Sequence, residues 1–212
     1  MTPQDSSQRT EEICRLAPVI PVLVVEDPAK AKPLARALIA GGLPALEVTL
    51  RTPAALEVIA EMAQVEGGIV GAGTLLSPHD VAAAKAAGAR FGVSPGSTEA
   101  LLSACEAEAL PLLPGAATAT EAMHLLERGF SVQKFFPAEA AGGAALLKAL
   151  SAPLPQIRFC PTGGISATNA RDYLALTNTL CVGGSWVAPK ELVARENWQG
   201  ITELAKQAAK LP

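Results

Sequence analysis

The sequence predicts an α/β protein built as a (β/α)8 TIM barrel with an N-terminal lead-in helix. Short apolar segments alternate regularly with helix-like segments along the chain, which is typical of a parallel sheet. The length of 212 residues suits a compact barrel with short loops. No linker or low-complexity segment divides the chain, so residues 1–212 are expected to form one domain. An open doubly wound sheet is the alternative, but the G-x-G-x-x-G motif usual after its first strand is absent.

The first half of the chain begins with a polar helix over about residues 6–16. Residues 18–25 are almost continuously apolar, which indicates a buried parallel strand. Pro21 lacks an amide hydrogen, so we expect pairing to begin after it or a bulge to accommodate it. Asp27 and Pro28 open a helix that Gly41 and Gly42 close after residue 40. The elements expected next are strand 45–50, helix 53–64, strand 68–73, helix 78–88, strand 90–93 and helix 97–109.

The second half continues the same alternation. We expect strand 110–114, helix 118–128, strand 131–137, helix 143–150, strand 156–160, helix 166–176, strand 179–182 and a final helix over 198–210. This makes eight strands, each followed by a helix. In such a barrel the chemistry lies where the strands end and the following loops begin.

Composition excludes several classes of function. The formal net charge is −3, so binding to a nucleic-acid backbone is not expected. The longest apolar run, residues 16–25, is too short to span a membrane, and acidic residues precede it, which argues against a signal peptide. Four widely spaced cysteines without a C-x-x-C motif indicate buried free thiols in a reducing cytoplasm. Two isolated histidines do not suggest a metal site.

Residues 131–137 read S-V-Q-K-F-F-P and place Lys134 in an apolar strand. A cation there is costly unless it is paired or uncharged. One interpretation is a lysine at a strand end that extends its amine to solvent. The other is an amine kept uncharged by burial and able to attack a carbonyl group.

The second strand places Glu47, Thr49 and Arg51 on one face, because alternate residues of a strand point to the same side. An internal Glu47–Arg51 ion pair is one explanation. The other is a carboxyl group that carries protons, next to an arginine that binds a substrate carboxylate. We favour the second, since a purely structural role is better filled by apolar side chains.

Glycine pairs follow the seventh and eighth strands, at Gly163-Gly164 and Gly183-Gly184, and Ser185 comes next. Loops at these positions of a barrel often bind phosphate through backbone N–H groups. The lysine, the carboxyl group, the arginine and these loops together favour covalent carbonyl chemistry on a small phosphorylated oxo acid.

The chain resembles the class I 2-keto-3-deoxy-6-phosphogluconate (KDPG) aldolases, also called 2-dehydro-3-deoxy-phosphogluconate aldolases. The matching segments are E-V-T-L-R-T (47–52), G-A-G-T (71–74), S-P-G (94–96), P-G-A-A-T (114–118), K-F-F-P-A-E (134–139), F-C-P-T-G-G-I-S (159–166) and G-G-S-W (183–186). They span nearly the whole chain after residue 18. The resemblance implies a trimeric barrel that cleaves KDPG reversibly to pyruvate and glyceraldehyde 3-phosphate, a step of the Entner–Doudoroff pathway.

The resemblance also implies the roles of individual residues. It identifies Lys134 as the Schiff-base lysine and Glu47 as the proton carrier. The remaining residues it implies are Arg51 and Thr74 for the pyruvate carboxylate, Phe136 as a pocket wall, Thr162 near the substrate hydroxyls, and Gly163, Gly164, Gly184 and Ser185 for the phosphate. No metal or other cofactor is expected, because the lysine itself forms the covalent intermediate.

Four alternative functions stay open at this point. The nearest is the sister aldolase that acts on the phosphogalactonate epimer, or an aldolase for 4-hydroxy-2-oxoglutarate. A phosphate-binding isomerase barrel would use other acids and bases and would not need Lys134. A non-catalytic barrel serving as a sensor would leave Lys134 as a solvent-directed side chain.

Overall fold

The computed structural model describes all 212 residues. The strands are β1 (Val19–Leu23), β2 (Ala45–Thr49), β3 (Ile69–Gly73), β4 (Phe91–Val93), β5 (Leu112–Leu113), β6 (Gly115–Ala116), β7 (Val132–Phe135), β8 (Arg158–Pro161) and β9 (Val182–Gly184). The helices are α1 (Pro3–Cys14), the 3-10 turn η1 (Pro28–Lys30), α2 (Ala31–Ala40), α3 (Ala55–Met62), α4 (Pro78–Ala86), α5 (Glu99–Ala107), α6 (Ala119–Glu127), α7 (Gly143–Ser151), α8 (Ala170–Leu174), α9 (Lys190–Ala194) and α10 (Trp198–Ala208).

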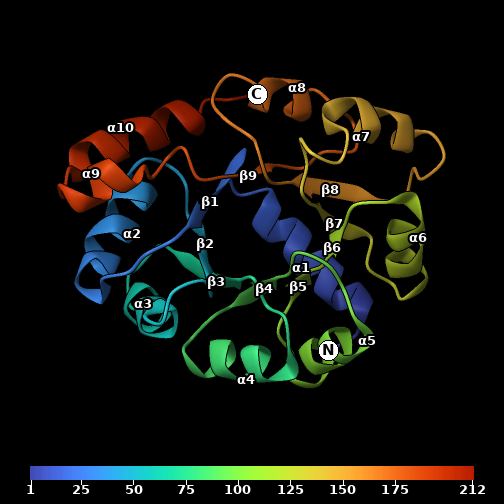
Figure 1. Cartoon of the computed structure of the whole chain (residues 1–212), viewed down its shortest axis with the longest axis horizontal. Helices are drawn as coiled ribbons and strands as arrows, with labels where there is room; N and C mark the ends of the chain where they lie inside the picture. The colour runs from blue at the N-terminus through green and yellow to red at the C-terminus, as the bar shows by residue number, and fades with distance from the viewer.

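The strands are all parallel and form two sheets. A six-stranded sheet has the order β5-β4-β3-β2-β1-β9, and a three-stranded sheet has the order β6-β7-β8. Figure 1 shows the strands curling around a common centre, with helices α2 to α8 following one another outside them and α9 and α10 beside α2. The predicted α/β class with a curled parallel sheet and outer helices is confirmed.

Proline explains one difference from the predicted strands. The expected strand 110–114 is two short strands, β5 and β6, on either side of Pro114. Pro114 has no amide hydrogen to donate to a neighbouring strand, although its carbonyl accepts from Lys134 N at 2.8 Å. Pro21 is tolerated in β1, where it pairs with Gly184 of β9, whereas the pairing of β1 with β2 begins at Val22.

The eighth predicted strand is displaced, and one helix was not predicted. The expected strand 179–182 is wrong in position, because β9 covers Val182–Gly184 and so includes the glycine pair expected in the loop. The short helix α9 precedes α10 and was missed. None of the helices combines the length and apolar character needed to cross a membrane.

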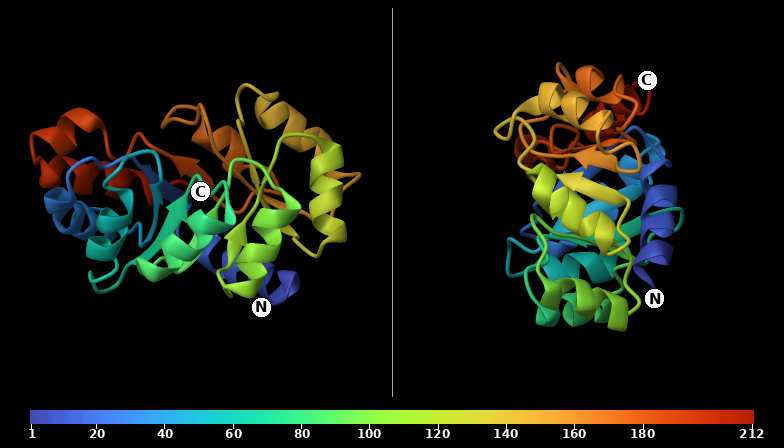
Figure 2. Two further views of the ribbon diagram at one scale, coloured as in Figure 1. Left: turned by 60° about the horizontal axis from the view of Figure 1, so that its bottom comes forward. Right: turned by 90° about the vertical axis from the view of Figure 1, so that its right-hand side faces the viewer.

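The lead-in helix α1 covers the amino-terminal ends of the strands (Figure 2). It begins at Pro3, earlier than predicted, because Thr2 and Asp5 form a reciprocal capping box. The buried Ser6 hydroxyl accepts a hydrogen bond from Leu112 N at 2.9 Å. The buried Ser7 hydroxyl accepts one from Ser131 N at 3.0 Å. The helix therefore closes that end of the sheet and leaves the carboxyl-terminal ends of the strands for the site.

Two apolar clusters fill the molecule. The larger one packs the outer helices against the sheet, and a cluster of 9 residues fills the inside of the curled sheet. The inner cluster consists of Cys14, Ile20, Ala45, Phe91, Val93, Leu113, Val132, Cys160 and Cys181. Because strand side chains alternate, Glu47 and Lys134 lie on the same inner face as Ala45 and Val132, one step nearer the carboxyl-terminal ends.

Candidate active site

Lys134 and Glu47 meet inside the curled sheet. Lys134 Nζ lies 3.4 Å from Glu47 Oε1, and their side chains are only 7% and 3% exposed. The lysine therefore does not extend to solvent, and that interpretation of the sequence is wrong. Burial raises the pKa of the Glu47 carboxyl above its ordinary value, although the nearby Lys134 charge opposes this shift. The pair can exchange a proton across a single hydrogen bond.

Gly73 of β3 makes room for the Glu47 carboxyl group. A Cβ atom at position 73 would lie 2.2 Å from Glu47 Oε1 and 2.7 Å from its Cγ. Glu47 pairs in register with Gly71, and Gly73 is the next inward position on the same strand. The second glycine of the G-A-G-T motif is thus required by the side chain opposite it.

Arg51 does not pair with Glu47, so the internal ion pair, the explanation that the sequence analysis did not favour, is absent. The ion pair of Glu47 is with Lys134. Arg51 follows β2, is exposed, and donates from Nε to Thr49 Oγ1 at 3.1 Å. Its terminal nitrogens have no carboxylate partner within 4.0 Å. A guanidinium group in this state can bind an incoming carboxylate.

A cavity of about 160 Å³ joins these groups to other predicted site residues. Its lining comprises Val22, Glu47, Thr49, Arg51, Thr74, Pro95, Lys134, Phe136 and Thr162. The lining includes every residue predicted for catalysis and for contact with the substrate body. Phe136 lies with its ring centroid 5.1 Å from Lys134 Nζ. Thr74 has a φ of 62°, a strained value for a non-glycine residue that directs its side chain at the end of β3.

Val22 and Pro95 line the cavity but were not assigned to it from the sequence. Thr49, which the sequence placed on the same face as Glu47 and Arg51 without giving it a role, lines the cavity as well. Val22 occupies an inward position of β1, which pairs in register with Glu47. Pro95 belongs to the S-P-G segment that follows β4. The two-residue period of β1 and the position of that segment would have identified both residues.

The glycines predicted to bind phosphate are not in the cavity lining, because Gly163 and Gly164 lie in the loop after β8 and Gly184 is the last residue of β9. Gly163 and Gly164 have φ values of 101° and 78°, which glycine adopts without strain. A Cβ at Gly164 would lie 2.6 Å from Cγ of Glu139. A parallel bridge between Thr162 and Gly183 brings the loop after β8 next to the end of β9.

Gly184 and Ser185 lie at the end of β9, next to the loop after β8. A Cβ at Gly184 would lie 1.7 Å from the Trp186 ring, so the close packing of Trp186 requires glycine at position 184. Ser185 is exposed directly after β9. The loop after β8 and the end of β9 thus lie side by side, next to Thr162 of the cavity lining.

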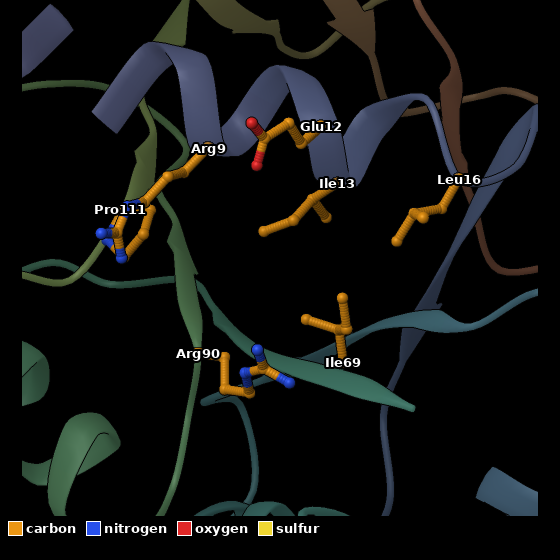
Figure 3. Close-up of a pocket in the computed structure, with 7 residues that line it drawn as sticks. All are labelled: Arg9, Glu12, Ile13, Leu16, Ile69, Arg90 and Pro111. Atoms are coloured by element: carbon orange, nitrogen blue, oxygen red, sulfur yellow. The ribbon is translucent and has the colours of Figure 1, made fainter. Parts of the chain in front are cut away.

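A larger cavity lies at the opposite end of the strands and contains none of the predicted residues. It measures about 380 Å³ and is lined by Arg9, Glu12, Ile13, Leu16, Ile69, Arg90 and Pro111. Figure 3 shows Ile13 pointing from α1 toward Ile69 at the start of β3. In barrels this end contributes to stability rather than to chemistry. The smaller cavity is therefore the candidate active site.

The chemistry that this arrangement permits follows from its donor groups. Lys134 supplies an amine, Glu47 an acid–base group and Arg51 a guanidinium group, and all three line one small cavity. An amine beside an acid–base group is suited to forming an imine with a carbonyl compound. No cluster of three or more histidine, cysteine or acidic residues is arranged as a metal site.

Comparisons with known proteins point to the same chemistry. The model of the family described as KDPG and KHG aldolase matches residues 10–204. The 2-dehydro-3-deoxy-phosphogluconate aldolase of Pseudoalteromonas atlantica is 50% identical over 200 residues, which cover 94% of this chain and 93% of that protein.

Two solved structures are similar over nearly the whole chain. The KDPG aldolase of Zymomonas mobilis with 3-phosphoglycerate has a TM-score of 0.91 and 50% identity, covering 97% of both chains. The KDPG aldolase of Legionella pneumophila, with pyruvate captured at low pH as a covalent carbinolamine intermediate, has a TM-score of 0.92 and 46% identity. This match covers 94% of the present chain and 98% of the Legionella chain.

Proposed function

The chain belongs to the KDPG and KHG aldolase family, and from this premise we propose that it cleaves KDPG reversibly to pyruvate and D-glyceraldehyde 3-phosphate through a Schiff base on Lys134. This reaction is a step of the Entner–Doudoroff pathway, and the enzyme is a carbon–carbon lyase. The observation that carries the proposal is the buried contact of Lys134 with Glu47 in a cavity that also contains Arg51.

Imine formation is the first chemical stage. The Lys134 amine attacks the C2 carbonyl of the substrate, while Arg51 and Thr74 bind the adjacent carboxylate. Glu47 gives a proton to the departing oxygen, so that the carbinolamine loses water and leaves a protonated imine. The hydrogen bond of 3.4 Å between Glu47 and Lys134 puts the proton carrier beside the reacting nitrogen.

Cleavage of the C3–C4 bond follows. The protonated imine accepts the electron pair of that bond and becomes an enamine, and the C4 hydroxyl proton passes to Glu47 or to a water that it holds. Glyceraldehyde 3-phosphate leaves as the aldehyde. Protonation of the enamine and hydrolysis of the imine then release pyruvate and restore Lys134. Phe136 excludes water from the imine, and Thr162 contacts the substrate hydroxyls.

The phosphate group is proposed to bind at Gly163, Gly164, Gly184 and Ser185. Adjacent loops with backbone N–H groups at the end of the strands support this assignment. The structural relative from Zymomonas, which was solved with a phosphorylated carboxylate, supports it further. Phosphate held here supplies binding energy remote from the reacting carbons and orients them.

We propose that the strands form a closed (β/α)8 barrel in a single domain over residues 1–212. Only Pro114 separates β5 from β6, so the two count as one strand of the barrel. The bridges Thr162–Gly183 and Phe159–Thr179 link β8 to the segment that contains β9. These links support closure of the ring at both gaps between the two sheets.

The homotrimer that the resemblance implies and the cytoplasmic location that the cysteine pattern indicates remain predictions. Light scattering on the purified protein at several concentrations measures the first. We also propose that the reaction needs no metal or other cofactor, because Lys134 provides the electron sink through its imine. Full activity after dialysis against a strong chelator is the expected result.

Trapping with borohydride tests the central proposal. The protein is incubated with pyruvate and sodium borohydride, digested, and analysed by mass spectrometry. The expected adduct lies on the peptide that contains Lys134, and Lys134→Met abolishes both the adduct and the lyase activity. Binding of a phosphorylated ligand without any pyruvate adduct would instead support the isomerase or sensor alternatives.

A second activity, on 4-hydroxy-2-oxoglutarate, is supported by the family description, which includes KHG aldolases. This substrate lacks a phosphate group but has the same 2-oxo acid unit. The C4 epimer of KDPG shares that unit as well. Measuring kcat/KM for KDPG, for its galactonate epimer and for 4-hydroxy-2-oxoglutarate ranks the three, and we expect KDPG to rank first.

A further inference from the structure

Thr49 lies between the end of β1 and the guanidinium group of Arg51. Its hydroxyl donates a hydrogen bond to the backbone carbonyl of Leu23 at 2.8 Å. The same oxygen accepts a hydrogen bond from Arg51 Nε at 3.1 Å. Thr49 is 2% exposed, so its bond to Leu23 is buried, whereas its bond to the exposed Arg51 is partly buried. The three groups form a series of two hydrogen bonds that runs from the backbone of β1 to the exposed arginine.

The single hydroxyl proton of Thr49 fixes which groups donate and which accept in these two hydrogen bonds. The Leu23 carbonyl can only accept, so the Thr49 proton points toward it. The lone pairs of Thr49 Oγ1 then face Arg51, whose Nε–H can only donate. A threonine at this position therefore holds Arg51 by a bond that cannot reverse.

Arg51 needs such a restraint because little else fixes it. It lies two residues beyond the end of β2, is exposed, and forms no ion pair with a carboxylate. A free arginine side chain loses rotamer entropy when a ligand immobilises it. A bond at Nε removes part of that cost in advance and leaves the two terminal nitrogens free for bidentate contact with a carboxylate.

We infer that Thr49 is a positioning residue for substrate binding, which aims the Arg51 guanidinium group at the carboxylate of the 2-oxo acid. This inference rests on the proposed function, in which Arg51 binds that carboxylate. Thr49 does not touch the reacting atoms in this scheme, so its effect is on affinity rather than on the chemical steps. It acts on every substrate that carries the 2-oxo acid unit, phosphorylated or not.

The test compares two substitutions that differ in one group. Thr49→Val is nearly isosteric and removes the hydroxyl, whereas Thr49→Ser keeps the hydroxyl and removes the methyl group. The pyruvate concentration that half-saturates borohydride trapping on Lys134 is measured for each protein. We expect Thr49→Val to raise it about tenfold and Thr49→Ser to change it less than about threefold, as for loss and retention of a hydrogen bond to a charged group. KM for KDPG should rise in parallel while kcat stays within about threefold.

Arg51→Ala provides the background that separates positioning from a general structural effect. If Thr49 acts through Arg51, Thr49→Val has no further effect on half-saturation in the Arg51→Ala protein. The inference is overturned if Thr49→Val raises the half-saturating pyruvate concentration by the same factor in the Arg51→Ala protein as in the natural protein. It is also overturned if Thr49→Ser and Thr49→Val raise that concentration equally. A crystal structure of Thr49→Val in which Arg51 Nε is unmoved also overturns it.

If the proposed function is wrong, the experiment gives a different result. In that case the unsubstituted protein gives no pyruvate adduct, before any variant is compared. Failure of the inference alone leaves normal trapping in the unsubstituted protein and in Thr49→Val. The melting temperature of each variant, measured alongside, identifies any loss that arises from instability.

Discussion

Lys134 Nζ and Glu47 Oε1 lie 3.4 Å apart although their strands, β7 and β2, belong to different sheets of the molecule. Glu47 is the carboxyl group of the cavity lining, and it lies next to the Lys134 amine. The lysine charge affects the ionisation of Glu47, because it opposes the rise that burial imposes on the Glu47 pKa. The catalytic and stability properties of the protein should therefore depend together on Glu47.

Replacing Glu47 with Gln should lower kcat by about 10²–10⁴-fold, the range expected for loss of a general acid–base group. Burial raises the Glu47 pKa above its ordinary value of 4.5, so the acid limb of kcat/KM should lie above that pH in the natural protein. Glu47→Gln should lack this limb. Initial rates across a pH series check both points, and an unchanged acid limb in the variant would assign that limb to another group.

The same pKa shift predicts how stability depends on pH. Glu47 has a higher pKa in the folded than in the unfolded protein, so the folded state binds the extra proton. Its stabilising contribution is complete below the unfolded value of about 4.5 and is lost as the pH rises through the folded pKa. Glu47→Gln cannot ionise and should gain stability relative to the natural protein as the pH increases. Urea unfolding at several pH values measures the difference, and a difference independent of pH contradicts the shift.

Gly73→Ala should disable Glu47 without changing any group that reacts. A methyl group at this position would lie 2.2 Å from Glu47 Oε1, so the carboxyl must move away from Lys134. We expect kcat to fall at least about tenfold, since misplacement of a catalytic group by about 1 Å can cost about a hundredfold. The matched control is Gly96→Ala, in the segment that follows β4, where an added Cβ meets nothing within 4 Å. Equal activity of the two variants would show that Gly73 has no such role.

The inward groups of the site could be predicted from the sequence because they follow the two-residue period of strands. Glu47 and Lys134 both occupy inward positions, and both line the cavity as expected. The choice between an ion pair with Arg51 and one with Lys134 could not be predicted. It depends on which strands face each other across the curled sheet, and no local pattern encodes that relationship.

The contacts that position these groups could not be predicted from the sequence either. The clash that requires glycine at position 73 involves a side chain on the neighbouring strand. The bond from Thr49 to the Leu23 carbonyl joins residues that are far apart in the chain. The position of β9 was misjudged because Gly183 and Gly184 are typical of turns, whereas close approach of Thr162 and Trp186 makes them necessary within the strand end.

Gly164→Ala should impair phosphorylated substrates selectively. Gly164 has a φ of 78°, and an added Cβ would lie 2.6 Å from Cγ of Glu139, so the loop after β8 must shift. If this loop binds phosphate through its backbone, KM for KDPG should rise about tenfold or more, as for loss of a hydrogen bond to a charged group. Half-saturation of pyruvate trapping should stay unchanged, because Arg51 and Lys134 lie in the cavity rather than in this loop.

The control for this variant separates backbone strain from displacement of the loop. Gly67→Ala has the same kind of strain, with a φ of 83°, but its added Cβ would be 3.5 Å from Ile39, an ordinary contact distant from the site. Both variants should lose about 1–2 kcal/mol of stability for an alanine in the left-handed region. Only Gly164→Ala should raise KM for KDPG. A parallel rise for pyruvate and KDPG would mean that the loop positions the whole cavity rather than the phosphate group alone.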